Sequence, residues 1–336
     1  MGKMKTKNNY LKYIAIALVI VFLIAAAFLF LEVWENREGR FPVSGTEDGV
    51  VEYNGKEYVQ KDNIETFLVL GLDKYDGADS ADSHESGVQA DFLMLFVFNN
   101  ETKQSTAIQI NRDTMTKVNK LSVGGTSVVE TYTKQIALAY NYVNDDNDKI
   151  RCRNTKDSVE YLLNGIKVDH YLSLTMDAVP AGCDLVGGVE VTVLDDFTGI
   201  DDALVKGEKV TLTGEQALRY VRTRYGLEDS TNSTRMARQQ QYINALYDKV
   251  SSLIEADNEF LVKLVDTLDD YVVYDSSDQK MLKFAEKFDD YEFLGIKEIE
   301  GKSEIGEEFI EFYPDENSVW NIVIDLFYTP KMNDIE

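Results

Sequence analysis

Half of the arginines in this acidic chain lie in one short segment. Of ten arginines in 336 residues with a formal net charge of −25, five fall between positions 219 and 238. They are Arg219, Arg222, Arg224, Arg235 and Arg238. A guanidinium group is always charged and binds phosphate oxygens through paired N–H donors. The cluster favours a clamp for phosphate or pyrophosphate. The competing interpretation is a solvated helix face whose arginines pair with acids such as Glu215.

Local patterns place these arginines on two predicted helices joined by a loop. The first helix is predicted to begin at Thr213, and Arg219 and Arg222 share one of its faces. The polar run 228–233 predicts the loop. Three side chains then lie at i, i+3 and i+4 on a second helix: Arg235, Arg238 and Gln239. We expect the two helices to close on one anion.

Charged residues at the ends of predicted strands form a second candidate group. The apolar run 66–73 ends in Asp73, and the run 91–98 begins with Asp91. Continuous apolar runs are typical of strands buried on both faces. A third predicted strand, 105–110, is followed by Arg112. Ligands of open α/β sheets bind outside the carboxyl ends of the strands, so these three side chains are candidate catalytic residues.

The two aspartates are also candidate metal ligands. Mg²⁺ or Mn²⁺ held by Asp73 and Asp91 would bridge phosphate oxygens, because hard cations prefer oxygen ligands. With only two histidines, the chain disfavours a Ser–His–Asp triad and a His-based zinc site. A carboxylate or the phosphate itself is then the candidate base. Two structural alternatives remain open. Asp73 is also typical of a turn residue, and Arg112 and Asp113 could form a buried ion pair.

Strands and helices alternate along the rest of the chain, which predicts an α/β fold. We expect an α/β/α sandwich with a mixed central sheet in a single domain. A short hairpin is predicted at 50–59. Further strands are predicted at 171–174, 189–194, 297–299 and 309–312. Helical segments are predicted at 136–140, 155–163, 177–186, 233–254, 263–268, 279–288 and 318–327.

The first forty residues predict a membrane anchor. Residues 14–31 are eighteen consecutive apolar residues after a lysine-rich start, and that length is near the minimum for a membrane-spanning helix. The basic flank predicts a cytoplasmic N-terminus. A cleaved signal peptide is the competing interpretation, and no small-residue cleavage site follows the run. We expect a cytoplasmic tail (1–13), a transmembrane helix (14–31), a connector (32–62) and an extracytoplasmic catalytic domain (63–330).

Cysteine usage and charge limit the other classes of function. Cys152 and Cys183 are the two cysteines. They form either one disulfide or two buried thiols, and both interpretations stay open. The acidic balance excludes general affinity for nucleic acid, which requires a basic face.

Seven short motifs, in this order, resemble the LytR–CpsA–Psr family of Gram-positive wall proteins. They are FLVLGLD (67–73), ADF (90–92), NRDT (111–114), GIKVDHY (165–171), LVGGVEV (185–191), GEQALRYVR (214–222) and RMARQ (235–239). The resemblance runs from about 65 to 327. It implies a transferase that moves a teichoic acid or a capsular polysaccharide from a polyprenyl-pyrophosphate carrier at the membrane onto peptidoglycan.

The resemblance also implies roles for individual residues. Asp73 and Asp91 match the acids associated with the metal and the pyrophosphate, whereas Arg219 falls at a variable position. The residues that match pyrophosphate ligands, with Arg238 in the same motif, are Arg112, Arg222, Arg224, Arg235 and Gln239. The resemblance further implies an apolar tunnel for the polyprenyl chain between the sheet and the helices.

Four residues depart from the family pattern: Gln89 replaces an arginine, Asn111 a proline, Ala137 an asparagine and Asn232 an aspartate. Losing the aspartate at 232 removes one candidate base. Three hypotheses therefore stay open. They are a metal-assisted phosphotransferase or pyrophosphatase, an attenuator that holds polyprenyl pyrophosphate without turnover, and a structural wall-anchoring protein.

Overall fold

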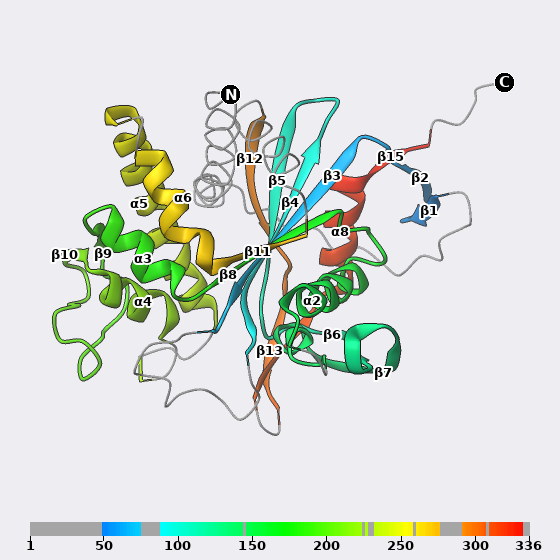
Figure 1. Cartoon of the computed structure of the whole chain (residues 1–336). Helices are drawn as coiled ribbons and strands as arrows, with labels where there is room; N and C mark the ends of the chain where they lie inside the picture. The colour runs from blue at the N-terminus through cyan, green and yellow to red at the C-terminus, as the bar shows by residue number, and fades with distance from the viewer. Residues whose placement is uncertain are drawn as a thin grey trace, which may run out of the picture. The chain divides into compact units, whose positions relative to one another are not determined.

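The computed structural model of the chain (Figure 1) describes residues 49–74, 88–143, 146–223, 226–227, 232–257, 260–275, 291–306 and 309–331. The predicted anchor 14–31, the predicted helix 279–288 and Arg224 lie outside these residues. In the part of the chain that is described, no helix combines the length and the apolar character needed to cross a membrane. The anchor therefore stays a prediction.

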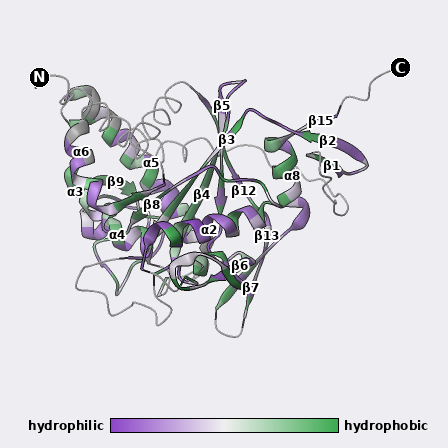
Figure 2. Cartoon of the chain, turned by 45° about the vertical axis from the view of Figure 1, so that its right-hand side comes forward, coloured by the Kyte–Doolittle hydropathy of each residue, from purple (hydrophilic) through white to green (hydrophobic). Residues whose placement is uncertain are grey.

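The fold is α/β with a mixed central sheet of six strands, ordered β11-β8-β3-β4-β5-β12. Their bounds are β3 (Ile64–Leu72), β4 (Ala90–Asn99), β5 (Gln104–Ile110), β8 (His170–Thr175), β11 (Val272–Tyr274) and β12 (Glu292–Glu298). Phe67, Leu68 and Phe96 are fully buried, as the continuous apolar runs of these strands predict. Figure 2 shows β4 almost entirely in the hydrophobic colour, while α2 (Asp148–Leu162) carries both colours.

The described residues divide into two compact units. Unit 1 takes its residues from 69–88 and 172–295, and unit 2 from 30–68, 89–171 and 296–336. Each unit is therefore assembled from segments that are far apart in the sequence, and each contains part of the predicted site.

Unit 1 contains five helices and the antiparallel pair of β9 and β10 among its described residues. The elements are α3 (Ala178–Leu185), β9 (Val189–Thr192), β10 (Lys209–Leu212), α4 (Gly214–Arg222), α5 (Asn232–Ala256), α6 (Phe260–Leu268) and the 3-10 helix η4 (Asp269–Tyr271). Val189, Val191 and Tyr220 are part of its hydrophobic core. Gly188 has φ +93°, and a Cβ there would lie 2.7 Å from a Thr211 methyl carbon. Only glycine suits this turn.

Besides the antiparallel pair β4–β5 of the central sheet, the described residues of unit 2 form three antiparallel hairpins, together with α2 and α8. The elements are β1 (Val50–Tyr53), β2 (Lys56–Gln60), β6 (Met115–Leu121), η2 (Val123–Gly125), β7 (Val128–Gln135), η3 (Ile136–Tyr140), α2, β13 (Gly301–Ile305), β14 (Ile310–Pro314), α8 (Glu316–Phe327) and β15 (Tyr328–Pro330). The hairpins are β1–β2, β6–β7 and β13–β14, and β15 adds to the edge of β2.

Several predictions are confirmed and others need correction. Most of the strands, the hairpin at 50–59 and the helices 177–186, 233–254, 263–268 and 318–327 are present within a few residues of the predicted bounds. The predicted strand 297–299 overlaps only the end of β12, which begins at Glu292. Residues 136–140 form a 3-10 helix, and α2 begins at Asp148 rather than at Thr155. Cys152 and Cys183 are buried free thiols, so the disulfide interpretation is wrong.

Candidate functional site

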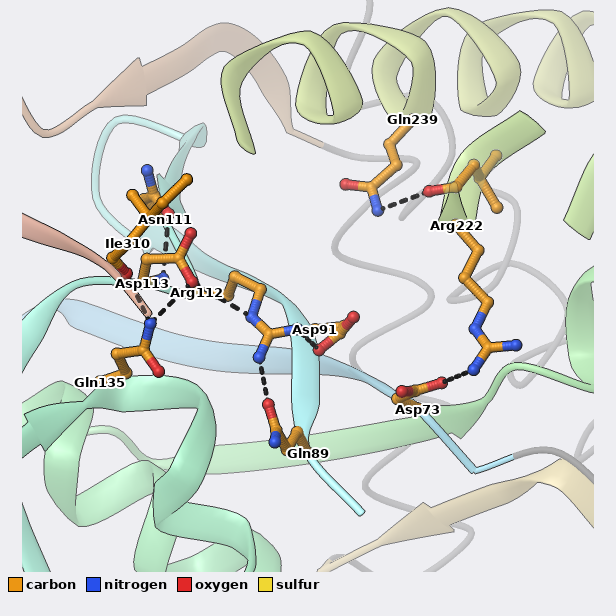
Figure 3. Close-up of polar contacts among 11 residues, drawn as sticks. Asp73, Gln89, Asp91, Asn111, Arg112, Asp113, Gln135, Arg222, Gln239 and Ile310 are labelled. Atoms are coloured by element: carbon orange, nitrogen blue, oxygen red, sulfur yellow. Dashed lines mark hydrogen bonds and ion pairs between the residues drawn. The ribbon is translucent and has the colours of Figure 1, made fainter. Parts of the chain in front are cut away.

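The antiparallel pairing of β4 and β5 places Arg112 beside Asp91 in unit 2. Leu93 pairs with Ile110 in the register, so the residues two places further out, Asp91 and Arg112, face each other across the end of the ladder. The Arg112 guanidinium forms an ion pair with Asp91 through Nη1 and donates from Nη2 to Gln89 Oε1 (Figure 3). Its Nε lies 3.5 Å from Asp113 Oδ1. One planar cation is thus held by two carboxylates and an amide.

Asp113 is fixed by its own set of contacts. Gln135 Nε2 donates to Asp113 Oδ1 at 3.0 Å and to the Ile310 carbonyl at 2.7 Å. The Asp113 N–H donates to Asn111 Oδ1 at 3.0 Å. The carboxyl end of β7 and the start of β14 therefore anchor the turn that carries Arg112 (Figure 3). The buried Arg112–Asp113 pair, which the sequence left as an alternative, is present together with the Asp91 contact.

Two residues that depart from the family pattern, Gln89 and Asn111, form hydrogen bonds in this site. Gln89 accepts a hydrogen bond from Arg112, which an arginine at position 89 could not do because its guanidinium has no acceptor. Asn111 accepts the Asp113 N–H through its side chain, and proline has no such group. Ala137 is fully buried, and its N–H donates to the Arg112 carbonyl at 3.1 Å. The side chain of Asn232 lies outside the described residues.

A second guanidinium–carboxylate pair lies in unit 1. Arg222 Nη2 is 3.1 Å from Asp73 Oδ1 (Figure 3). Asp73 directly follows β3, and Arg222 is the last residue of α4. Both side chains are partly exposed, at 25% for Arg222 and 16% for Asp73. Asp73 therefore follows a strand, as the turn interpretation predicts, and its side chain also forms an ion pair with Arg222.

The start of α4 is set by a capping box. Thr213 Oγ1 accepts the Gln216 N–H, and Gln216 Oε1 accepts the Thr213 N–H in return. Gly214 packs against α3: its N–H donates to Asp184 Oδ1 at 2.7 Å, and a Cβ there would lie 2.6 Å from the Pro180 carbonyl oxygen. These contacts fix the helix that carries Arg222.

The other arginines of the cluster differ in burial and partners. Arg219 forms ion pairs with Glu215 and, at 3.1 Å, with Asp201, as the solvated-face interpretation predicted for this residue. Arg235 is buried on α5.

Arg238, also on α5, is fully buried. Its guanidinium forms an ion pair with Asp195, donates to the carbonyls of Tyr220 and Thr223, and lies 5.5 Å from the centre of the Phe197 ring. These contacts make Arg238 part of the core, so we do not retain the predicted pyrophosphate contact for it.

Three residues that contact the charged groups described above were not predicted from the sequence. Gln135 binds Asp113, and Asp195 and Tyr220 bind Arg238. Burial raises the pKa of Tyr220 to about 12, so its hydroxyl stays protonated at neutral pH. That hydroxyl donates to Gln241 Oε1 at 2.5 Å and accepts the Leu194 N–H at 3.1 Å. The sequence did contain a signal for the role of Tyr220, because it lies at a core position of a helix and a buried tyrosine hydroxyl needs hydrogen-bond partners.

The predicted site residues are brought together in two pairs, Arg112 with Asp91 in unit 2 and Arg222 with Asp73 in unit 1. Across the described ranges, no three His, Cys, Asp or Glu side chains are grouped to hold a metal ion. Chemically, each pair offers a positive group for phosphate oxygens and a carboxylate that could bind a cation or accept a proton.

The model of the LytR_cpsA_psr family matches residues 42–323, most of the chain. The chain therefore belongs to the LytR_cpsA_psr family, and the resemblance found in the motifs is confirmed.

Relatives in this family carry different names. The chain is 29% identical over 245 residues to TagU of Enterococcus faecalis, which is named polyisoprenyl-teichoic acid–peptidoglycan teichoic acid transferase. The aligned residues cover 71% of this chain and 72% of the relative. It is 27% identical over 252 residues to biofilm regulatory protein A of Streptococcus mutans, covering 72% of this chain and 58% of the relative. The crystal structure of B. subtilis TagV has a TM-score of 0.54 at 23% identity, covering 79% of this chain and 96% of that one. That last likeness concerns the fold alone.

Proposed function

We propose that this chain is a membrane-anchored phosphotransferase that moves a glycopolymer from a polyprenyl-pyrophosphate carrier onto peptidoglycan. The observation that carries the proposal is the family match over residues 42–323. A relative within that family is named for a polyisoprenyl-linked teichoic acid donor and a peptidoglycan acceptor. The glycopolymer in this proposal is a teichoic acid or a capsular polysaccharide.

The proposed reaction is a displacement at phosphorus. A hydroxyl of peptidoglycan attacks the phosphorus that is bonded to the glycopolymer. The bond from that phosphorus to the bridging oxygen breaks, and polyprenyl phosphate leaves with the electron pair. The hydroxyl proton passes to a carboxylate or to a phosphate oxygen, and Asp91 and Asp73 are the candidate carboxylates. Negative charge grows on the leaving phosphate, so fixed cations accelerate the step.

The arginines supply those cations in the proposal. Arg112 and Arg222 are each oriented by a carboxylate, Asp91 and Asp73 respectively. Guanidinium can bind two phosphate oxygens at once, and a preset orientation lowers the entropic cost of doing so. Arg224, Arg235 and Gln239 remain proposed pyrophosphate ligands from the family motifs. Gln239 Nε2 also donates to the Val221 carbonyl at 3.1 Å.

A divalent cation fits the donor set. In sites that bind phosphate, Mg²⁺ takes one or two protein carboxylates and completes its shell with phosphate oxygens and water. Asp91 and Asp73 are carboxylates of this kind, and the substrate pyrophosphate supplies further oxygens. We therefore include Mg²⁺ or Mn²⁺ in the proposal, with Asp91 and Asp73 as the proposed carboxylate ligands. When bound, the ion would neutralise charge on the pyrophosphate oxygens.

The location that we propose for the catalytic domain rests on the sequence. Residues 14–31 would span the membrane, with the lysine-rich start in the cytoplasm and the domain outside it. Protease added to intact protoplasts of the expressing cell should then digest the domain. Protection of the domain from protease would contradict this location.

A second candidate is a module that binds polyprenyl pyrophosphate without transferring it. The name of the Streptococcus mutans relative, biofilm regulatory protein A, favours it, as does the loss of the expected aspartate at position 232. A pyrophosphatase, with water in place of the sugar hydroxyl, is the intermediate case.

One assay separates these candidates. The full chain in detergent is incubated with a lipid-pyrophosphate glycopolymer labelled in the glycan and with peptidoglycan. Label that becomes covalently attached to peptidoglycan supports the transferase. Label released into water without attachment supports the pyrophosphatase. Label retained on the protein as unchanged lipid supports the binding module.

A further inference from the structure

The carboxyl end of α4 is held by two side chains from α5. The last carbonyls of a helix have no partner within the helix and need donors from elsewhere. Arg238 Nε donates to the Tyr220 carbonyl at 2.8 Å, and Arg238 Nη2 donates to the Thr223 carbonyl. Gln239 Nε2 donates to the Val221 carbonyl at 3.1 Å. All of these contacts lie within unit 1.

The three carbonyls flank Arg222 in the chain. Tyr220 and Val221 precede it, and Thr223 follows it. The backbone on both sides of Arg222 is therefore fixed by one guanidinium. The Arg222 side chain leaves this fixed backbone to reach Asp73. Any rotation or fraying of the last turn of α4 would move the Arg222 guanidinium away from its position.

Arg238 is itself held by two further residues, Asp195 and Phe197. Asp195, three residues beyond β9, forms the ion pair with its Nη1, and the Phe197 ring lies 5.5 Å from its guanidinium carbon. Tyr220 stacks on the same Phe197 ring, with the two ring centres 5.6 Å apart. With its side chain fully enclosed, Arg238 acts on its neighbours in the core.

We propose that Arg238 is a positioning residue for Arg222: by binding the carbonyls on either side of it, Arg238 sets where the Arg222 guanidinium meets the pyrophosphate. This inference rests on the proposed function through the phosphate-binding role of Arg222. A lysine cannot replace Arg238, because a single ammonium group lacks the planar fork that reaches Asp195 and two separate carbonyls.

The first test compares two Arg→Lys variants of the full chain in detergent. Arg238→Lys keeps the charge beside Asp195 and loses the fork. Arg219→Lys is the matched control, since Arg219 is a partly exposed residue of α4 whose guanidinium pairs with Glu215 and Asp201. The probe is geranylgeranyl pyrophosphate, and its Kd is measured by calorimetry. We expect Arg238→Lys to raise Kd on the order of tenfold, about 1.4 kcal/mol, and Arg219→Lys to leave it within about twofold.

The second test asks whether Arg238 acts through Arg222. In the Arg222→Ala background, Arg238→Lys should change Kd by less than about twofold, because non-additivity is the mark of two residues that share one effect. Hydrogen exchange of the amides of 220–223 should be faster in Arg238→Lys than in the wild type. Asp195→Asn is a second variant, for the case in which Arg238→Lys does not fold. It should give a smaller rise in Kd with the same non-additivity.

The outcomes are distinct. An equal rise in Kd with and without Arg222 would overturn the inference, since Arg238 would then contact the ligand independently. An unchanged Kd in Arg238→Lys would also overturn it, because Arg238 would serve stability alone. If Arg222→Ala itself leaves Kd unchanged, the proposed phosphate role of Arg222 fails and the positioning role fails with it. The Arg222→Ala variant thus separates the two failures: an unchanged Kd there marks the failure of the proposed function, whereas a raised Kd there with an unchanged Kd in Arg238→Lys marks the failure of the positioning role alone.

Discussion

Arg222, at the end of α4, forms an ion pair with Asp73, the residue that follows β3, with Nη2 and Oδ1 3.1 Å apart. Unit 2 contains a similar pair, formed by Arg112, two residues after β5, and Asp91, the second residue of β4. In both pairs, a carboxylate orients a guanidinium that we propose for phosphate binding. A phosphate group would share the guanidinium with the carboxylate or replace it.

The role of Arg222 can be compared directly with that of Arg219, one turn earlier on α4. Arg222→Ala should weaken the binding of a pyrophosphate lipid by about 1.5–3 kcal/mol, the range for hydrogen bonds to charged groups. Arg219→Ala should have a much smaller effect, because the Arg219 guanidinium is already paired with Glu215 and Asp201. Calorimetric titration of both variants measures the difference. Equal and small effects at the two positions would favour the solvated-face interpretation of the cluster.

Metal dependence should appear in the response to chelation and to Asp91→Asn. Asparagine keeps the shape of the side chain and a carbonyl acceptor for Arg112, but it loses the charge that binds a cation. We expect excess EDTA to abolish glycopolymer transfer, Mg²⁺ or Mn²⁺ to restore it, and Asp91→Asn to abolish it in a folded protein. Circular dichroism of the variant is the control for folding. Full activity in EDTA or in Asp91→Asn would be incompatible with the proposed metal.

The central strands could be predicted from the sequence because their signal is strong and local. The runs that form β3, β4 and β5 are continuous and apolar, as burial on both faces requires. The hairpin of β6 and β7 was missed, because β7 is exposed over almost its whole length and its residues are mostly polar. A strand without a buried face leaves little hydrophobic periodicity to detect.

The sequence predicts which residues are candidates for the site, but not the role of each one. The density of arginine between 219 and 238 predicts a phosphate clamp in that segment, and two of the predicted site residues, Arg112 and Asp91, form an ion pair. Sequence could not separate the role of Arg222 from that of Arg238, because both are arginines of family motifs within the same arginine-rich segment. Their difference comes from tertiary contacts: Asp195 and Phe197, on a loop after β9, enclose Arg238. Such partners are set by packing and not by local spacing.

The capping box at the start of α4 should contribute measurably to stability. Thr213→Ala removes the side-chain oxygen that accepts the Gln216 N–H, and loss of an N-cap costs about 0.5–2 kcal/mol in the free energy of unfolding. Thr213→Ser keeps the oxygen and is the matched control. Urea unfolding of the two variants gives the comparison. A loss as large in Thr213→Ser as in Thr213→Ala would show that the cap is not the cause.

Asp157 on α2 should make stability depend on pH. Burial is the largest cause that raises the pKa of Asp157, although Lys156 opposes it. A raised pKa means that the folded state holds the proton more tightly than the unfolded state. Its stabilising contribution is therefore complete below the unfolded pKa of about 3.9 and is lost as the pH rises through the folded pKa. Asp157→Asn should be more stable than the wild type near neutral pH, and the difference should shrink on acidification. Urea unfolding at several pH values measures it; a difference that does not vary with pH would contradict this origin.

The most direct measurement of the central claim is the fate of the phosphorus atoms when the reaction is run in water enriched in ¹⁸O. The full chain, the lipid-pyrophosphate glycopolymer and peptidoglycan are incubated together, and the phosphate-containing products are analysed by mass spectrometry. The phosphotransferase account predicts polyprenyl monophosphate and peptidoglycan-linked glycopolymer phosphate in equal amounts, with no ¹⁸O in either. Glycopolymer phosphate that carries ¹⁸O and is not attached to peptidoglycan, or lipid pyrophosphate recovered unchanged, would contradict it.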